Sequence, residues 1–219
     1  MKGLLIKDFQ LLKNQKSFFV VFIAMAVIFL VTDMMSQDFL VSYVSFLSIV
    51  IMMSSMTYDE FNNGLSYLMT LPTTRKKYVQ EKYVFGFILL VIAWISTFLA
   101  TTAFYIGKGE SIPLSDWLIT CFMILLCAVI MMQCVLPLQL KFGQNKGNIA
   151  MALIVGVAFA IGFVVISIVK LFDIDLTYLM YMISQIDLVQ MVAIMIGLAI
   201  IVGFISYRIS LKIMYKKEL

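Results

Sequence analysis

The chain has 219 residues, of which 63% are hydrophobic, and its mean hydropathy is +1.05. Charged residues make up only 13%, about half of the share of roughly 25% that soluble proteins carry. A chain of this size could not bury so much apolar surface in water, so the composition excludes a soluble globular protein and predicts an all-α integral membrane protein. The net charge of +4 says little as a total, because the position of each charge is what matters.

Long runs without a charged residue mark the expected membrane spans. A hydrocarbon core about 30 Å thick needs about 20 helical residues, and the first run is the only one that falls short. That run is extended to residues that can snorkel to the membrane surface. The chain, 1–219, is therefore expected to form a single transmembrane domain of six helices, with spans at residues 17–35, 39–58, 83–107, 117–140, 147–169 and 188–207.

The basic residues predict how these spans are oriented. Six spans place both termini on the same side of the membrane. If that side is the cytoplasm, 14 of the 16 Lys and Arg residues lie in cytoplasmic segments, and only Lys108 and Lys170 lie outside. Because Lys and Arg concentrate in cytoplasmic loops, we expect a multi-pass protein of the cell membrane with both termini in the cytoplasm.

The first segment, residues 1–16, intersperses lysines with apolar residues. Leu5, Phe9 and Leu12 share one face of a helix, so we expect a helix that lies in the cytoplasmic interface before the first span. A cleaved signal peptide is the alternative. The polar residues ahead of the apolar run, and the lack of an A-x-A site after it, disfavour that alternative.

The loop at residues 59–82 is the longest polar interruption of the chain. Phe61, Leu65 and Leu68 fall on one helical face, and Pro72 would end such a helix because it lacks an N–H group. Thr73 or Thr74 could cap the helix that follows. We expect this loop to present a short amphipathic helix to a partner in the cytoplasm, with the alternative that its apolar face lies on the bilayer.

Two predicted spans contain polar residues that need partners. Ser45, Ser48 and Ser55 in span 39–58 are small enough to let another helix approach, which we favour over a surface that lines a substrate pathway. In span 117–140, Gln133 must find a hydrogen-bond partner, and Pro137 leaves a carbonyl free one turn earlier. We prefer bonding between helices to contact with a transported substrate.

The segment at residues 172–187 is too apolar for a free loop and too short for a complete span. We expect one or two short helices there, at the outer surface of the membrane. The loop at residues 141–147 is short and basic. It would face the cytoplasm.

Missing residues exclude several classes of function. The chain has no histidine, so a Ser-His-Asp triad, a Cys-His pair and an H-E-x-x-H zinc site are all excluded. Its three cysteines share one predicted span at spacings that cannot converge on a metal ion. There is no P-loop motif for ATP, and the membrane explains the basic clusters without a nucleic acid. We therefore expect no catalytic residue, no metal site and no nucleic-acid partner.

Charged residues are also nearly absent from the six predicted spans, in which Asp33, near the end of span 17–35, is the only one. Transporters driven by protons or ions generally need acidic or basic groups at the middle of the membrane. A transporter that protons or ions drive without a partner subunit is therefore disfavoured.

Two stretches of the sequence resemble a known family. They are L-L-I-K-D-F near the N-terminus and D-E-x-x-x-G-L-x-Y-L-x-T-L-P-x-x-R-K-x-Y-V-x-x-K from Asp59 to Lys82. With these motifs, the chain resembles the membrane subunits of ABC exporters of the ABC-2 type, specifically the small six-helix bacterial permeases that carry no ATPase domain. Permeases that export amphipathic peptides, including the phenol-soluble modulin exporters of staphylococci, look similar to it.

This resemblance implies a permease subunit that is not itself an enzyme. It implies an elbow helix at residues 1–16 and short coupling helices that bind a separate cytoplasmic ABC ATPase, present in two copies. That ATPase would bind ATP and Mg²⁺, and this chain would hold no cofactor. The implied coupling residues are Asp59, Glu60, Phe61, Leu65, Leu68, Leu71, Pro72, Arg75, Lys141, Phe142, Asn145 and Lys146.

The resemblance also implies what the permease assembles with and transports. A second copy or a close paralogue would complete the membrane pathway, and the cargo would be a hydrophobic or amphipathic peptide such as a toxin or an antimicrobial peptide. Two alternatives from other classes remain. One is an immunity or sensor protein of the membrane that transports nothing, and the other is a membrane-embedded enzyme.

Overall fold

A computed structural model describes residues 2–14, 24–26, 28–29, 36–61, 64–109, 114–143 and 188–217. Four helices in these ranges are long and apolar enough to cross a membrane. The expected spans at 17–35 and 147–169 and the expected external helices at 172–187 lie largely or wholly outside the described residues, so the count of six spans stays a prediction. The labelled helices are α1 (Lys2–Asn14), α3 (Gln37–Glu60), α4 (Gly64–Thr70), α5 (Arg75–Gly107), α6 (Leu114–Phe142) and α9 (Leu188–Lys216).

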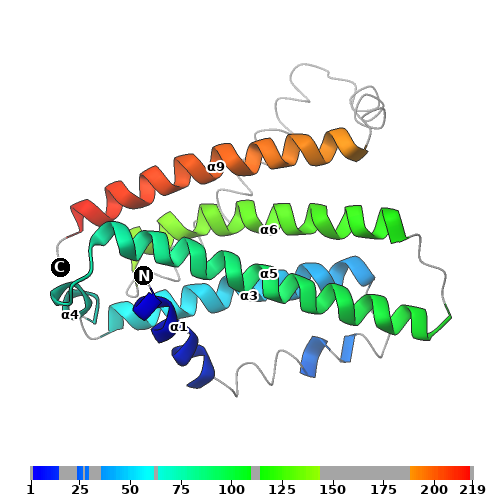
Figure 1. Cartoon of the computed structure of the whole chain (residues 1–219), viewed down its shortest axis with the longest axis horizontal. Helices are drawn as coiled ribbons and strands as arrows, with labels where there is room; N and C mark the ends of the chain where they lie inside the picture. Colours follow the sequence, from blue (N-terminus) through cyan, green and yellow to red (C-terminus); the bar gives the residue numbers. More distant parts are fainter. Residues whose placement is uncertain are drawn as a thin grey trace, which may run out of the picture.

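The four long helices lie lengthwise beside one another, and α1 crosses one end of the bundle (Figure 1). α6 packs along α9, and α3 packs along both α5 and α6. The C-terminal ends of α3, α6 and α9 lie at the same end of the bundle as α1 and α4 (Figure 1). We call this the α4 end. The arrangement agrees with the predicted topology, in which all these helix ends share one side of the membrane.

Each described span is a longer helix than the charge-free run that predicted it. α5 has 33 residues, so it is about 50 Å long and exceeds a hydrocarbon core of about 30 Å. The predicted span began at residue 83, but the helix begins eight residues earlier, at the α4 end. A charge-free run measures the hydrocarbon layer alone, and a helix continues past it wherever charged side chains find water or partners.

The break between α4 and α5 follows from the local sequence. Leu71 and Pro72 separate the two helices, since proline cannot continue the hydrogen-bond ladder of α4. Thr74 then caps α5, because its extended backbone lets its hydroxyl accept a hydrogen bond of 3.2 Å from the backbone N–H of Lys77. The predicted break and the predicted cap are both confirmed.

Gly86 lies where α3, α5 and α6 approach one another. A side-chain carbon at this position would come within 2.8 Å of the sulfur of Met132 on α6, and it would also meet Met52 on α3. Glycine therefore permits the close approach of three helices here. The apolar core around it includes Met56, Tyr78, Phe85, Leu90, Val135, Leu136, Leu140 and Met214.

A stack of aromatic rings joins α5 to α6 in a second, smaller cluster. The ring of Phe98 stacks on Trp94 and on Trp117, with centroids 5.6 Å and 6.4 Å apart. Trp94 donates to the carbonyl of Cys121 at 2.7 Å, and Trp117 donates to the hydroxyl of Thr102 at 3.0 Å. Each indole N–H therefore has a partner, as a buried tryptophan requires.

Candidate functional site

Lys82, on α5, lies at the centre of a set of charged side chains at the α4 end. Its side chain is fully buried. Its ammonium group pairs with Asp8 of α1 and with Asp59 of α3, 2.7 Å away, and it donates to the hydroxyl of Ser55 at 3.2 Å. We call this set the buried charge cluster, and its members are Lys7, Asp8, Asp59, Tyr78, Glu81 and Lys82.

α1 contributes Lys7 and Asp8 to the cluster. Lys7 pairs with Asp59 and lies 3.1 Å from Asp8, which is fully buried. Burial alone would raise the pKa of Asp8, but the ammonium groups of Lys82 and Lys7 outweigh it and hold that pKa below its ordinary value. Asp8 is therefore ionised at neutral pH, and it fastens α1 to the bundle through charge.

The face by which α1 packs differs from the stripe that the sequence predicted. Among the described side chains of α1, Leu4, Asp8 and Leu12 are buried, whereas Phe9 is 40% exposed and its ring meets that of Phe85 edge to face. Leu5 packs partly against the core. The predicted stripe shares Leu12 with this face and does not include Leu4 or Asp8. A helix is present as expected, and its position in the membrane interface stays a prediction.

Asp59 was expected at a surface that contacts an ATPase, but the structure buries it. It is 5% exposed, and it accepts a hydrogen bond of 3.2 Å from the hydroxyl of Tyr78. With Lys7 and Lys82 also paired to it, this carboxylate is directed into the protein. Two of the three partners, Tyr78 and Lys82, lie near the other end of the same predicted loop, where the chain is already helical in α5, and the third, Lys7, lies on α1. The spacing of apolar residues in the loop does not show that these ends fold against each other.

α4 presents two different faces. Leu65 and Leu68 are buried in the main core, so the apolar spacing that suggested a free docking face is explained by packing within the chain. Tyr67, which the sequence analysis did not single out, is 72% exposed. Phe61 and Leu71, at the borders of α4, are 55% and 47% exposed, and Pro72 is exposed as well.

Glu60 and Lys217 join the ends of α3 and α9. Their charged groups lie 2.5 Å apart, and Lys217 also donates to the carbonyl of Leu140 at 3.2 Å. Gly143, which ends α6 with a positive φ of 60°, lies against the carboxylate of Glu60. A left-handed residue after a helix is usually glycine. The ends of three helices therefore meet at Glu60.

Arg75 caps the end of α9. Its guanidinium donates to the carbonyls of Met214 and Tyr215 at 3.1 Å and 2.6 Å. Those carbonyls belong to the last turn of the helix, where no intrahelical donor is available and where positive charge is favourable. Arg75 was expected to contact an ATPase, and the structure gives it this role inside the chain.

The second predicted coupling loop is described only at its start. Lys141 is exposed, and its ammonium group lies 5.3 Å from the centre of the Phe142 ring. Asn145 and Lys146 lie outside the described residues.

The comparison with known families decides what kind of membrane protein this is. The family model of the ABC-2 family transporter proteins matches residues 3–215. The chain belongs to the ABC-2 transporter family. It is thus a membrane permease of an ABC transporter, a class that works with a partner ABC ATPase. No curated protein and no solved structure matches the chain significantly.

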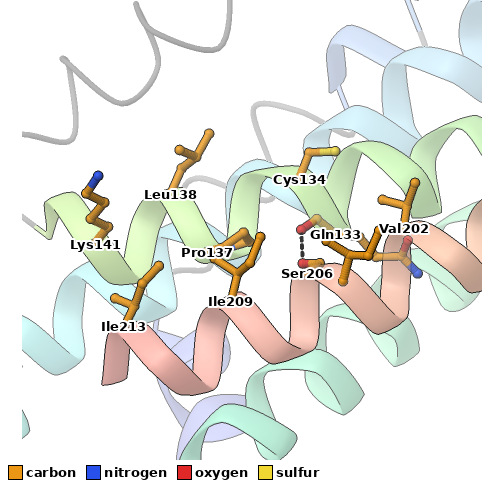
Figure 2. A pocket seen from close by; sticks show the side chains of 10 residues that line it. Gln133, Cys134, Pro137, Leu138, Lys141, Val202, Ser206, Ile209 and Ile213 are labelled. Carbon is orange, nitrogen blue, oxygen red and sulfur yellow. Dashed lines mark hydrogen bonds between the residues drawn. The ribbon is translucent and has the colours of Figure 1, made fainter. Parts of the chain in front are cut away.

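The backbone carbonyl that Pro137 of this ABC-2 permease leaves free has a partner that the sequence did not identify. The side-chain Oε1 of Gln133, in contrast, is buried and receives no hydrogen bond from the described residues. Pro137 lies four residues after Gln133, so the carbonyl of Gln133 lacks its normal helical donor. Ser206 of α9 donates its hydroxyl to that carbonyl (Figure 2). The side-chain amide of Gln133 lies over Gly203 of α9, where a side-chain carbon would come within 2.8 Å of its nitrogen.

A cavity of about 510 Å³ opens between α6 and α9 of the permease (Figure 2). Gln133 and Ser206 lie at one end of it, and Lys141 lies at the other. Apolar side chains such as Ile209 and Ile213 line the space between them. Its surface is thus mainly apolar, with polar groups near its two ends.

Three of the five serines of α3 are buried inside the permease, namely Ser45, Ser48 and Ser55. Ser45 and Ser48 donate to carbonyls of their own helix, at 2.7 Å and 2.6 Å, and Ser55 contacts Lys82. These contacts give the serines a role in packing and in the buried charge cluster. Of the cysteines, Cys121 is buried and Cys127 and Cys134 are exposed, and all three are free.

Proposed function

We propose that this permease exports amphipathic or hydrophobic peptides and that a separate ATPase drives it by binding at the α4 end. Two copies of the ATPase, each holding ATP and Mg²⁺, would act on a pathway formed with a second permease copy or a close paralogue. Membership of the ABC-2 family supports the permease and the ATPase. The similarity of the loop at residues 59–82 to bacterial peptide exporters supports the cargo.

One observation carries the coupling part of this proposal. The exposed aromatic and apolar residues Phe61, Tyr67 and Leu71 border or belong to α4, whose opposite face is fixed in the core by Leu65 and Leu68. A surface of this kind is suited to binding, because aromatic residues contribute much of the energy at protein interfaces. A partner bound to this surface of α4 would transmit its movement to the helices of the bundle.

Movement of α4 would reach several helices at once. α4 contacts α3, and the end of α3 joins α1 and α5 through the buried charge cluster and α9 through Glu60. An ATPase that binds one arrangement of these helices better than another would shift the permease between them. The free energy of ATP binding then biases which side of the membrane the pathway opens to.

The outward face of α9 offers a surface for the lipid or for the second permease copy. It is rich in exposed apolar residues, among them Val189, Ile200, Ile201 and Phe204. Such a face is stable only against lipid or another apolar surface.

The test is capture of the ATPase by the full-length permease, followed by measurement of ATP hydrolysis. The double substitution Tyr67→Ala with Leu71→Ala removes exposed side chains and should leave the fold intact. We expect ATPase binding to weaken by about tenfold or more, which equals about 1.4 kcal/mol. The matched control is Leu114→Ala, which is also exposed but begins α6 at the far end.

Two outcomes would contradict the proposal. A permease that purifies without any ATPase, and that changes no partner hydrolysis, would favour a membrane protein that does not transport. Equal binding by the double variant and the control would place the contact elsewhere. The peptide cargo is tested separately, by comparing export of labelled amphipathic peptides from cells that have or lack the permease.

A further inference from the structure

Glu81 is a buried acid that accepts no hydrogen bond from the described residues. Its side chain is fully buried, and both of its carboxyl oxygens lack a hydrogen bond from any described residue. The nearest cation is the ammonium group of Lys82, which is 3.7 Å away and already pairs with Asp8 and Asp59. An ionised carboxylate in this position would lack the donors that normally stabilise a buried charge.

Asp8 offers the complementary half of a hydrogen bond. Its Oδ2 pairs with Lys82, while its Oδ1 receives no hydrogen bond from the described residues, although Lys7 lies 3.1 Å from it. Asp8 and Glu81 both lie against the ammonium group of Lys82, and each has a buried oxygen that receives no hydrogen bond from the described residues. A hydrogen bond between the two carboxyl groups needs a proton on one of them, because two ionised carboxylates have only acceptors.

The charges of the cluster lead to the same requirement. Among the residues that the structure describes, the charged and titratable groups around Glu81 are Lys7 and Asp8 on α1, Asp59 on α3, and Tyr78 and Lys82 on α5. Two ammonium groups therefore face three carboxyl groups, and one proton makes the cluster neutral. A buried site disfavours net charge, and two neighbouring carboxyl groups commonly hold one proton between them.

We propose that Glu81 is a proton-binding site, which holds a proton at neutral pH and donates it to Asp8 across the contact between α5 and α1. Asp8 is the ionised partner, since its charge is balanced by Lys82 and Lys7. When α1 leaves the bundle, Glu81 loses its acceptor and gains water, so it releases the proton. Proton binding and the docking of α1 are thereby linked. The proposal does not depend on export or on the ATPase.

The direct test is infrared spectroscopy of the purified full-length permease at neutral pH. A protonated carboxylic acid has its own carbonyl stretching band, separate from that of carboxylates. We expect the wild type to show this band and Glu81→Gln to lose it. The control is Glu60→Gln, which changes a glutamate paired with Lys217 at the same end of the bundle and should keep the band.

Absence of the band from the wild type, or its persistence in Glu81→Gln, would overturn the proposal. If that variant does not fold, isotopic labelling of glutamate in the wild type replaces it. The band must then shift, and an unshifted band would assign the proton to another residue type.

A second measurement follows stability across pH. A group that holds its proton more tightly in the folded state stabilises the fold fully below its unfolded pKa, and this contribution is lost as the pH rises through the folded pKa. We expect the melting temperature of the wild type to fall between about pH 4.5 and about pH 8, because burial raises the pKa of Glu81 to about 8 in the folded protein, and that of Glu81→Gln to fall less. Equal slopes for the two proteins would overturn the link between proton binding and folding.

Discussion

Ser206 on α9 donates its hydroxyl to the backbone carbonyl of Gln133 on α6. The hydroxyl of Tyr83, on α5, lies 2.5 Å from the same serine oxygen and 2.9 Å from Ser210. Pro137 creates the need for this contact, since it removes the N–H that would have bonded the carbonyl. Three helices are therefore joined at a point where a membrane leaves few other donors.

Removing this hydroxyl should destabilise the bundle. Ser206→Ala leaves the carbonyl of Gln133 without a donor, and we expect a loss of about 1–3 kcal/mol. Unfolding in mixed detergent measures it. The control is Ser96→Ala, because Ser96 is exposed and its hydroxyl bonds only to its own helix, at 2.9 Å from the carbonyl of Ala93.

A double-mutant cycle with Pro137→Ala separates the stated cause from a loss of packing. Alanine restores the N–H, so Ser206→Ala should cost less in that background. An unchanged cost would show that the serine stabilises the bundle by other means.

Any side chain at Gly86, where α3, α5 and α6 meet, should destabilise the bundle. Gly86→Ala would push Met52 and Met132 aside, and overpacking of this kind costs about 1–3 kcal/mol. Gly197→Ala is the matched control, since it lies within α9 and a side-chain carbon there would meet nothing within 4 Å. It should be neutral or stabilising, because alanine favours a helix more than glycine does. Equal effects of the two substitutions on the melting temperature would contradict this account.

Asp8 should make the stability of the permease depend on pH in the acidic range. Asp8→Asn leaves Lys82 without one of its buried partners, and we expect a loss of about 3–5 kcal/mol at neutral pH. The pKa of Asp8 is lowered in the folded state, so its contribution is fully present above the unfolded value of 3.8 and is lost as pH falls through the folded value. Thermal unfolding should therefore show a gap between wild type and variant that closes below about pH 4. A gap that stayed constant would mean that the charge of Asp8 is not what stabilises the protein.

The sequence predicted the parts of the fold that depend on local chemistry. Charge-free runs located α3, α5, α6 and α9 because hydrocarbon tolerates few charges, and Pro72 and Thr74 marked where helices stop and start. The buried charge cluster was missed because Asp8 and Lys82 are 74 positions apart, and a charged residue taken alone suggests a solvent-facing one. Leu65 and Leu68 show the same limit. Their spacing predicted an apolar face correctly but could not say that the bundle itself covers it.

The two hydrogen bonds from Arg75 should stabilise the last turn of α9. Arg75→Lys keeps the positive charge but loses the planar fork that reaches the carbonyls of Met214 and Tyr215. We expect the last turn of α9 to open more readily, by about 1 kcal/mol or roughly fivefold faster amide hydrogen exchange. Lys212→Met is the control, since Lys212 is exposed on the same helix and its loss should leave exchange nearly unchanged. If exchange at the end of α9 is the same in both variants, the two hydrogen bonds of Arg75 do not hold this helix. The joint between α5 and α9 would then depend on other contacts, among them those of Tyr83 with Ser206 and Ser210.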